Sequence, residues 1–137
     1  MRELQALYRE AIRRHAAQPV GLRKPIEATH AHECSNPLCG DRVEIRMKLV
    51  SGMIEDIAFD GEACTICMAS ASMLCEQAVG QPADRLRSRH ESLRTALHDQ
   101  AELADDDPLA PLLGVRPYPS RIRCATLPWE AAVKAIS

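Results

Sequence analysis

Hydrophobic and charged residues alternate along residues 42–50, which is the period of a half-buried β-strand. One face of this strand would carry Val43, Ile45, Met47 and Leu49. A looser alternation follows over residues 53–59, and Ser51-Gly52 between the two segments is a turn signal. These segments predict an antiparallel hairpin. We expect a further short strand near residues 28–31.

Helical patterns account for most of the remaining chain. An amphipathic helix is predicted over residues 2–17, with Leu4, Leu7, Tyr8, Ile12 and Ala16 on its apolar face. Residues 64–79 predict a buried helix closed by Gly80, and Pro82 opens another with Leu86, Leu93 and Leu97 on one face. Residues 109–113 predict a short helical turn, and residues 114–120 an extended connector. The last helix is expected over about residues 126–136. The predicted fold is α+β: a small three-stranded antiparallel sheet with helices packed on one face and at the ends.

Composition narrows the functional classes. A chain of 137 residues is expected to form a single domain, residues 1–137. A net charge of −2 and 3% aromatic residues argue against nucleic-acid binding. No apolar run is long enough to span a membrane, and the N-terminus lacks the apolar stretch of a signal peptide. We therefore expect a cytoplasmic protein. Six cysteines in a reducing compartment favour metal or sulfur chemistry over disulfides.

A thiol and a carboxylate flank Gly40 in the segment Asn36-Pro37-Leu38-Cys39-Gly40-Asp41. If Ser51 and Gly52 are the central turn residues, the residue numbers of any two residues that lie opposite each other in the hairpin add up to 103. Asp41 then lies opposite Glu62, and Cys39 opposite Cys64; a β-bulge would shift this register by one residue. Three sulfurs, from Cys39, Cys64 and Cys124, and the carboxylate of Asp41 match a four-coordinate metal site.

The surroundings of the two distant cysteines fit this hypothesis. Cys64 is predicted at a helix N-terminus, where backbone N–H groups and the helix dipole favour a thiolate. Cys124 is expected just before the last helix, in a similar setting. Arg121 and Arg123 would offset the excess negative charge of three thiolates and a carboxylate. A carboxylate exchanges more readily than a thiolate, so the site looks built to release a ligand.

The other thiols and the histidines leave alternatives open. Cys64-Thr65-Ile66-Cys67 is a CxxC, which indicates either zinc or a redox pair, and Cys67 could face the site or the core. Cys34 could be a spare thiol near the rim of the site, and Cys75 is expected to be buried packing. His30 and His32 could be additional ligands or solvent-exposed residues.

Three motifs, in order, resemble the IscU/NifU-type iron–sulfur scaffold superfamily and its SufU branch. The first motif covers residues 36–42. The second covers residues 59–73, of which Cys67 is not part of the pattern, and the third covers residues 113–129 and includes Arg121-Ile122-Arg123-Cys124. Classical scaffolds carry a histidine where this chain has Arg123. The stretch over residues 80–113 is long enough for the extra residues of the SufU branch. The similarity extends over nearly the whole chain.

The resemblance implies a SufU-type, zinc-dependent sulfurtransferase for iron–sulfur cluster assembly. Zinc would be held by Cys39, Asp41, Cys64 and Cys124. A PLP-dependent, SufS-type cysteine desulfurase would donate persulfide sulfur to Cys39, with Arg121 holding the persulfide or the displaced thiolate. The sulfur would then pass to a separate iron–sulfur scaffold.

The chain departs from the branch pattern at Cys34, Cys67 and Pro128. The additional thiols leave open whether a single cysteine carries sulfur. One alternative is a scaffold that builds a [2Fe–2S] cluster on the same residues. Another is a metal-stabilised binding module without catalysis, in which substitution of Cys39 would reduce stability rather than sulfur transfer.

Overall fold

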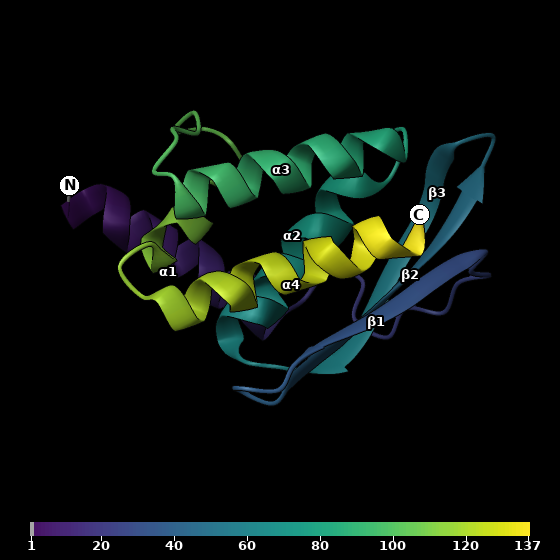
Figure 1. The fold of residues 1–137 in the computed structure, drawn as a ribbon, viewed down its shortest axis with the longest axis horizontal. Coiled ribbons are helices and arrows are strands. Elements are labelled where there is room, and N and C mark those ends of the chain that lie inside the picture. The colour runs from purple at the N-terminus through teal and green to yellow at the C-terminus, as the bar shows by residue number, and fades with distance from the viewer. Residues whose placement is uncertain (1) are drawn as a thin grey trace.

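Three antiparallel strands form one sheet in the order β1-β2-β3, and the helices lie to one side of it (Figure 1). The computed structural model describes residues 2–137, with side chains from Gln5 onward. The strands are β1 (His30–Asn36), β2 (Asp41–Val50) and β3 (Met53–Glu62). The helices are α1 (Arg2–Ala17), α2 (Thr65–Ala78), α3 (Asp84–His98), the 3-10 helix η1 (Ala110–Val115) and α4 (Pro119–Ala135). The predicted α+β class and the three-stranded sheet are confirmed.

The hairpin of β2 and β3 forms as the alternation predicts, but its register is shifted. The central turn residues Ser51 and Gly52 both have positive φ, as a two-residue hairpin loop requires. A β-bulge between Lys48 and Leu49 then offsets the rest of the ladder. Arg42, and not Asp41, therefore lies opposite Glu62. The simple pairing sum was wrong by one residue because it assumed an unbroken ladder.

The third strand is longer than predicted and lies further along the chain. It was expected near residues 28–31, whereas β1 runs from His30 to Asn36 and pairs with β2 along its whole length. Its exposed edge is polar, with only Cys34 and Asn36 buried. This weak apolar pattern explains why the sequence indicates the strand poorly. The pairing of Asn36 with Asp41 sets the ends of the loop that carries Cys39.

Helix α2 begins and ends within one residue of its predicted limits, but α4 begins well before Thr126. Pro119 stands at the start of α4, where a missing backbone N–H has no cost. The prolines near residue 119 had indicated an extended connector, so that prediction was wrong. Cys124 consequently lies in the second turn of α4 rather than before its N-terminus. Pro128 lies inside the helix.

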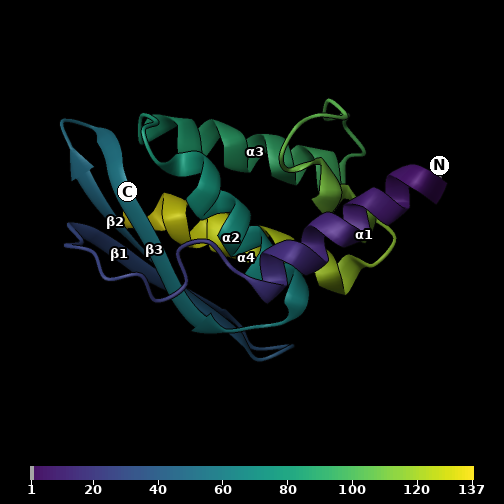
Figure 2. The same cartoon turned by 180° about the vertical axis from the view of Figure 1, so that it is seen from behind.

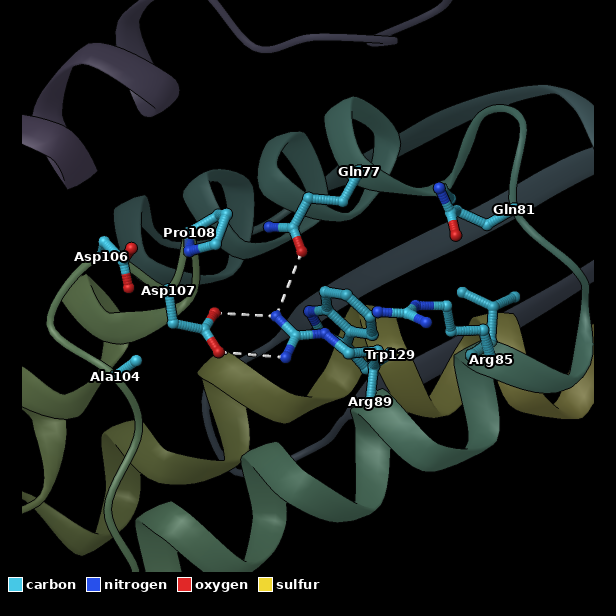
Figure 3. Close-up of a pocket in the computed structure, with 11 residues that line it drawn as sticks. Gln77, Gln81, Arg85, Arg89, Ala104, Asp106, Asp107, Pro108 and Trp129 are labelled. Carbon is cyan, nitrogen blue, oxygen red and sulfur yellow. Dashed lines mark hydrogen bonds and ion pairs between the residues drawn. The ribbon is translucent and has the colours of Figure 1, made fainter.

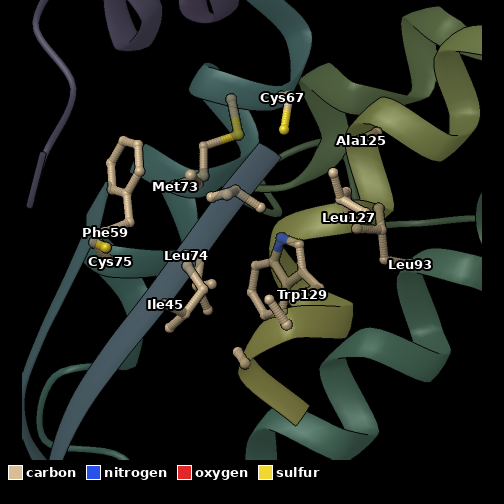
Figure 4. Packing of buried hydrophobic residues seen from close by; sticks show 14 of the residues in the cluster. Ile45, Phe59, Cys67, Met73, Leu74, Cys75, Leu93, Ala125, Leu127 and Trp129 are labelled. Atoms are coloured by element: carbon tan, nitrogen blue, oxygen red, sulfur yellow. The ribbon is translucent and has the colours of Figure 1, made fainter. Parts of the chain in front are cut away.

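The core lies between the sheet and the helices. Helix α4 packs against β1 and β2, α2 packs against α4, and α1 packs on the far side of α2 (Figures 1 and 2). Trp129 of α4 is buried in a cluster of apolar side chains from the sheet, α2, α3 and α4 (Figure 4). The fully buried members with the largest side chains include Phe59, Ile45, Met73, Leu74, Leu93 and Leu97.

The inward face of α1 differs in part from the prediction. Leu7 is 66% exposed, whereas His15 is buried and bonds through Nδ1 to Ser72 Oγ at 2.7 Å. Leu4, which was also assigned to the apolar face, falls outside the described side chains. A polar contact therefore helps to attach α1 to α2. Among the described helices, none is long and apolar enough to cross a membrane.

Candidate metal centre

Asn36, the first residue of the segment 36–41, holds the loop between β1 and β2. Asn36 is buried; its side-chain Oδ1 accepts a hydrogen bond from Leu38 N at 3.1 Å, and its carbonyl oxygen accepts one from Gly40 N at 2.9 Å. Gly40 has φ +75°, which L side chains rarely adopt. This tight turn presents Cys39 at the surface while Asp41 re-enters the sheet. The sequence indicates a turn at Asn36-Pro37 but does not show that the Asn36 side chain holds the loop.

Asp41 joins the loop to the start of α2. Its Oδ1 atom accepts a hydrogen bond from the backbone N–H of Cys64 at 2.9 Å. Cys64 is the N-cap of α2 in an extended conformation, as the sequence predicts, but its own side chain makes no capping bond. The carboxylate of Asp41 thus satisfies a helix-terminal N–H that would otherwise lack a partner.

The ligand atoms of Cys39, Asp41 and Cys124 lie within 4.8 Å of one another. Cys64 is the fourth predicted ligand and falls outside this mutual grouping. Cys64 nevertheless adjoins the Asp41 carboxyl, whose pKa it helps to lower, and the Cys124 thiol, whose pKa it helps to raise. Residues from three separate parts of the chain therefore meet at one end of the sheet.

Exposure differs sharply across the four residues. Asp41 and Cys124 are buried, Cys64 is half-buried, and Cys39 is exposed. Cys124 projects from the second turn of α4, and burial together with contacts from Cys64 and Asp41 raises the pKa of its thiol. Cys39 is thus the most exposed member of the group, while Asp41 and Cys124 lie buried beneath the surface.

Opposing effects act on the Asp41 carboxyl. Burial alone would raise its pKa, but the N–H of Cys64 and the thiols of Cys124, Cys39 and Cys64 together lower the pKa. Asp41 is therefore favoured as a carboxylate although its side chain is buried.

Two arginines near Cys124 have different partners. Arg123 forms an ion pair with Glu130, with Nη1 and Oε2 2.7 Å apart. Arg121 is exposed, and the sulfurs of Cys64 and Cys124 beside it raise the pKa of its guanidinium. Arg121 therefore adjoins the group of thiols, while Arg123 is paired with Glu130, which also pairs with Lys134.

The donor set fits a metal ion. Asp41 Oδ2 is buried and has no hydrogen-bond partner among the described residues, which is costly unless a cation or a water completes its environment. Three thiols and a carboxylate are ligands that Zn²⁺ accepts at a four-coordinate site. An iron–sulfur centre also uses thiolate ligands. The geometry is thus compatible with both groups.

The remaining cysteines occupy three different environments. Cys67 is fully buried, and burial, followed by the charges of Asp41, Cys64 and Cys39, raises the pKa of its thiol. Cys34 is also buried, but its charged neighbours are mainly Glu130, Lys134 and Arg123. Burial raises the pKa of Cys75 to about 12, as expected for a thiol that serves as core packing.

The two histidines considered as additional ligands lie along β1, away from the loop. His30 pairs with Met47 and His32 with Ile45, whereas the metal-site end of the strand is Asn36. His32 is exposed, and His30 Nδ1 bonds to Thr29 Oγ1 at 2.8 Å. Neither belongs to the group of close ligand atoms.

A pocket of about 410 Å³ lies elsewhere, between α2, α3 and the loop before η1 (Figure 3). Arg89 crosses it and forms a two-pronged ion pair with Asp107, while Gln77 Oε1 accepts from the same guanidinium at 3.3 Å. None of the four predicted ligands lines this pocket. The metal centre is instead a surface site, which suits a macromolecular partner better than a small enclosed substrate.

Comparison with known proteins places this arrangement in a family. The model of the NifU-like N-terminal domain matches residues 7–137. The chain belongs to the family of NifU-like N-terminal domains. It is 34% identical over 139 residues to the zinc-dependent sulfurtransferase SufU of Bacillus subtilis, covering 98% of this chain and 92% of that protein.

Two further relatives extend the comparison. The iron–sulfur cluster assembly scaffold protein IscU of Streptococcus pyogenes is 34% identical over 147 residues, with 98% of this chain and 85% of that protein covered. The crystal structure of a NifU-like protein N-terminal region from Brucella abortus matches with a TM-score of 0.85 at 24% identity. That match covers 94% of this chain and 91% of the other, and supports the fold. The predicted family is therefore confirmed.

Proposed function

We propose that this protein is a zinc-dependent sulfur-relay protein for iron–sulfur cluster assembly. Cys39, Asp41, Cys64 and Cys124 would hold the zinc, and Cys39 would accept sulfur from a cysteine desulfurase. The observation that carries the proposal is the asymmetry of the site: one exposed thiol stands over a buried carboxylate and a buried thiol. The similarity to SufU proteins supports zinc as the resident metal.

Zinc, when bound, would hold the thiols as thiolates at neutral pH and so keep a nucleophile available. Cys39 is the group best placed to meet a partner, because it lies at the tip of the β1–β2 loop. The hydrogen bonds that the side chain and carbonyl oxygen of Asn36 accept, and the one between Cys64 N and Asp41, position that loop over α2. Arg121 supplies positive charge on the same open side.

The transfer itself is a thiol–persulfide exchange. The Cys39 thiolate attacks the outer sulfur of a persulfide on the desulfurase, and the sulfur–sulfur bond of that persulfide breaks. The desulfurase cysteine leaves as a thiolate, and Cys39 carries the persulfide. No net oxidation occurs, because the sulfane sulfur only changes its bonding partner. Arg121 would stabilise the negative charge of the persulfide or of a displaced thiolate.

The partners and location follow from this role. The donor would be a PLP-dependent cysteine desulfurase, of the SufS type, and the acceptor a separate iron–sulfur scaffold. The reaction would take place in the cytoplasm. Alanine production by the desulfurase, measured with a reductant and with or without the zinc-loaded protein, tests this proposal. We expect a large stimulation that Cys39→Ala abolishes, whereas a Cys75→Ala variant keeps it.

No stimulation by the zinc-loaded wild-type protein would contradict the proposal. It would favour a second candidate, a scaffold that assembles a [2Fe–2S] cluster on the same residues. The similarity to IscU scaffold proteins supports this alternative. Reconstitution with iron and sulfide under anaerobic conditions would then give a coloured protein, and Cys39→Ala would lose that colour.

A further inference from the structure

The cysteines outside the proposed ligand set are Cys34, Cys67 and Cys75, and only Cys67 adjoins the site. Its charged neighbours are Asp41, Cys64 and Cys39. Cys34 instead lies near Glu130 and Lys134. Cys75 packs against the chain at Gly21, where an added Cβ would come within 2.8 Å of its sulfur. One thiol that is not needed for the metal therefore lies beside three groups that are.

Cys64 and Cys67 occupy the N-cap and N3 positions of α2. In a capping box, the side chain at each of these two positions reaches the backbone N–H of the other, so both side chains can lie at the same side of the helix end. Neighbours three residues apart on a helix have Cβ atoms about 5–6 Å apart, and a disulfide needs roughly 3.5–4.5 Å. Cys64 lies outside the regular helix, with φ −67° and ψ 167°, so a small movement of the N-cap can close this gap.

The two thiols differ in their access to solvent. Cys64 is half-buried and reachable by a small oxidant, whereas Cys67 is 0% exposed. Figure 4 shows Cys67 on α2 at the edge of the buried cluster that includes Ala125 of α4. An oxidant in solution would therefore meet Cys64 first. Cys67 would be protected until a neighbouring sulfur became electrophilic.

We propose that Cys64 and Cys67 form a reversible disulfide that inactivates the metal centre when the protein meets a peroxide. This inference rests on the ligand set of the proposed function. In the first step the sulfur of Cys64 attacks hydrogen peroxide, the O–O bond breaks, and a sulfenic acid forms with release of water. In the second step the sulfur of Cys67 displaces the hydroxyl from Cys64, and its proton leaves with it as a second water.

The balance of this reaction is two thiols and one peroxide giving one disulfide and two waters. Cys64 then no longer offers a thiolate, so the site loses a ligand and its affinity for zinc. A dithiol such as dithiothreitol reverses the change by reducing the disulfide. The local CxxC thereby protects the sulfur of Cys64 from further, irreversible oxidation.

A competing linkage would join Cys39 to Cys124, whose sulfurs belong to the close group of ligand atoms. That disulfide would take two proposed ligands from the metal, one in the β1–β2 loop and one in α4. The linkage to Cys67 removes one, because Cys67 is outside the ligand set, and it joins neighbours on a single helix. We therefore expect Cys67, which lies three residues from Cys64 at the start of the same helix, to capture oxidised Cys64 in competition with Cys124.

The test maps the disulfide after equimolar hydrogen peroxide is added to zinc-loaded and to metal-free protein. Free thiols are alkylated, and the peptides are identified by mass spectrometry. We expect Cys64 and Cys67 to be protected from alkylation in both samples, in a peptide lighter by two hydrogens, while Cys75 is alkylated. A chromogenic chelator should detect zinc release, and dithiothreitol followed by zinc should restore the metal content.

The variants separate this proposal from its alternatives. In Cys67→Ser we expect sulfenic acid trapped on Cys64 and, with excess peroxide, zinc binding that dithiothreitol no longer restores. Cys67→Ala checks the same result without a buried hydroxyl, and Cys75→Ser is the matched control and should behave as wild type. A wild-type linkage of Cys64 to Cys39 or Cys124, or no linkage in the zinc-loaded protein, would overturn the proposal. A disulfide in a protein that fails to stimulate the desulfurase would leave the switch intact and reject the sulfur relay.

Discussion

The backbone N–H of Cys64 donates a hydrogen bond to Asp41 Oδ1 across 2.9 Å and thereby joins β2 to the start of α2. The two residues are 23 positions apart, and both are proposed ligands of one metal ion. Asp41 has a second oxygen that is buried without a partner among the described residues. One carboxylate thus caps a helix and offers its free oxygen to the site.

This double role predicts different effects for two substitutions of Asp41. Asp41→Asn retains an oxygen acceptor for the Cys64 N–H, whereas Asp41→Ala leaves that N–H without its partner. We expect Asp41→Ala to be less stable than Asp41→Asn by about 1–3 kcal/mol in metal-free protein, the cost of an unsatisfied polar group. Urea unfolding after treatment with a chelator measures the difference.

Both Asp41 variants should bind zinc more weakly than wild type, because each loses the anionic ligand. Elemental analysis after dialysis against a competing chelator would show this. Equal stability of the two variants would mean that the hydrogen bond to Cys64 does not hold the helix to the strand.

Gly61 of β3 lies against the backbone of β2 with no room for a side chain. A Cβ at Gly61 would lie 2.1 Å from the carbonyl oxygen of Arg42, next to Asp41. We expect Gly61→Ala to lower the free energy of unfolding by roughly 1–3 kcal/mol, as forced overpacking does, and to weaken zinc binding by displacing Asp41.

Gly80→Ala is the matched control for this substitution. Gly80 also has a positive φ, of +84°, but a Cβ there meets no atom within 4 Å. Its cost should therefore come from backbone conformation alone and leave the metal content unchanged. Similar zinc loss in both variants would contradict the role of the close approach at Gly61.

The sequence predicts the elements with strong periodicity well, and the limits of the others poorly. Helix α2 and the alternation in β2 follow directly from side-chain patterns. Strand β1 does not, because most of its side chains are polar and exposed at the edge of the sheet. The start of α4 was missed because Pro119 was taken as part of a connector rather than as the first helical residue.

For the candidate site, the sequence predicts the proposed ligands but not the contacts between them. The motifs name Cys39, Asp41, Cys64 and Cys124, but they do not reveal that Asp41 bonds to the N–H of Cys64. Nor could the sequence tell that Arg123 is paired with Glu130 while Arg121 faces the thiols. These contacts depend on the register after the bulge and on the true start of α4, which long-range packing determines.

Because His15 is buried, we expect the protein to lose stability against unfolding in mildly acidic solution. Burial lowers the pKa of His15, an effect that Glu76 opposes and Arg14 reinforces. The unfolded chain therefore binds a proton more readily than the folded protein as the pH falls below about 6.5. The free energy of unfolding should decrease from that pH downward and level off once the folded protein also protonates His15.

Substitution of His15 isolates this contribution. Unfolding of His15→Gln should depend less on pH between about 7 and 5 than unfolding of wild type. Because burial also lowers the pKa of His90, part of the slope will remain, so the difference between the two proteins is the measured quantity. Identical slopes would show that His15 does not titrate differently on folding.

Arg121 and Arg123 form a matched pair for testing electrostatic support. Arg121→Gln should slow sulfur acceptance by roughly tenfold without changing zinc content, because a charged hydrogen bond to the persulfide is lost. Arg123→Gln should have little effect on the rate, since Arg123 is paired with Glu130. Alanine production at subsaturating protein compares them, and equal effects would reject a specific role for Arg121.

Peptide mass spectrometry can show whether Cys39 carries the transferred sulfur. The zinc-loaded protein is incubated with a cysteine desulfurase and cysteine, the thiols are alkylated without reductant, and the peptides are mapped. We expect one additional sulfur atom on the peptide that contains Cys39, and none on this protein in Cys39→Ala. An additional sulfur on Cys64, Cys67 or Cys124 with Cys39 unmodified would contradict it.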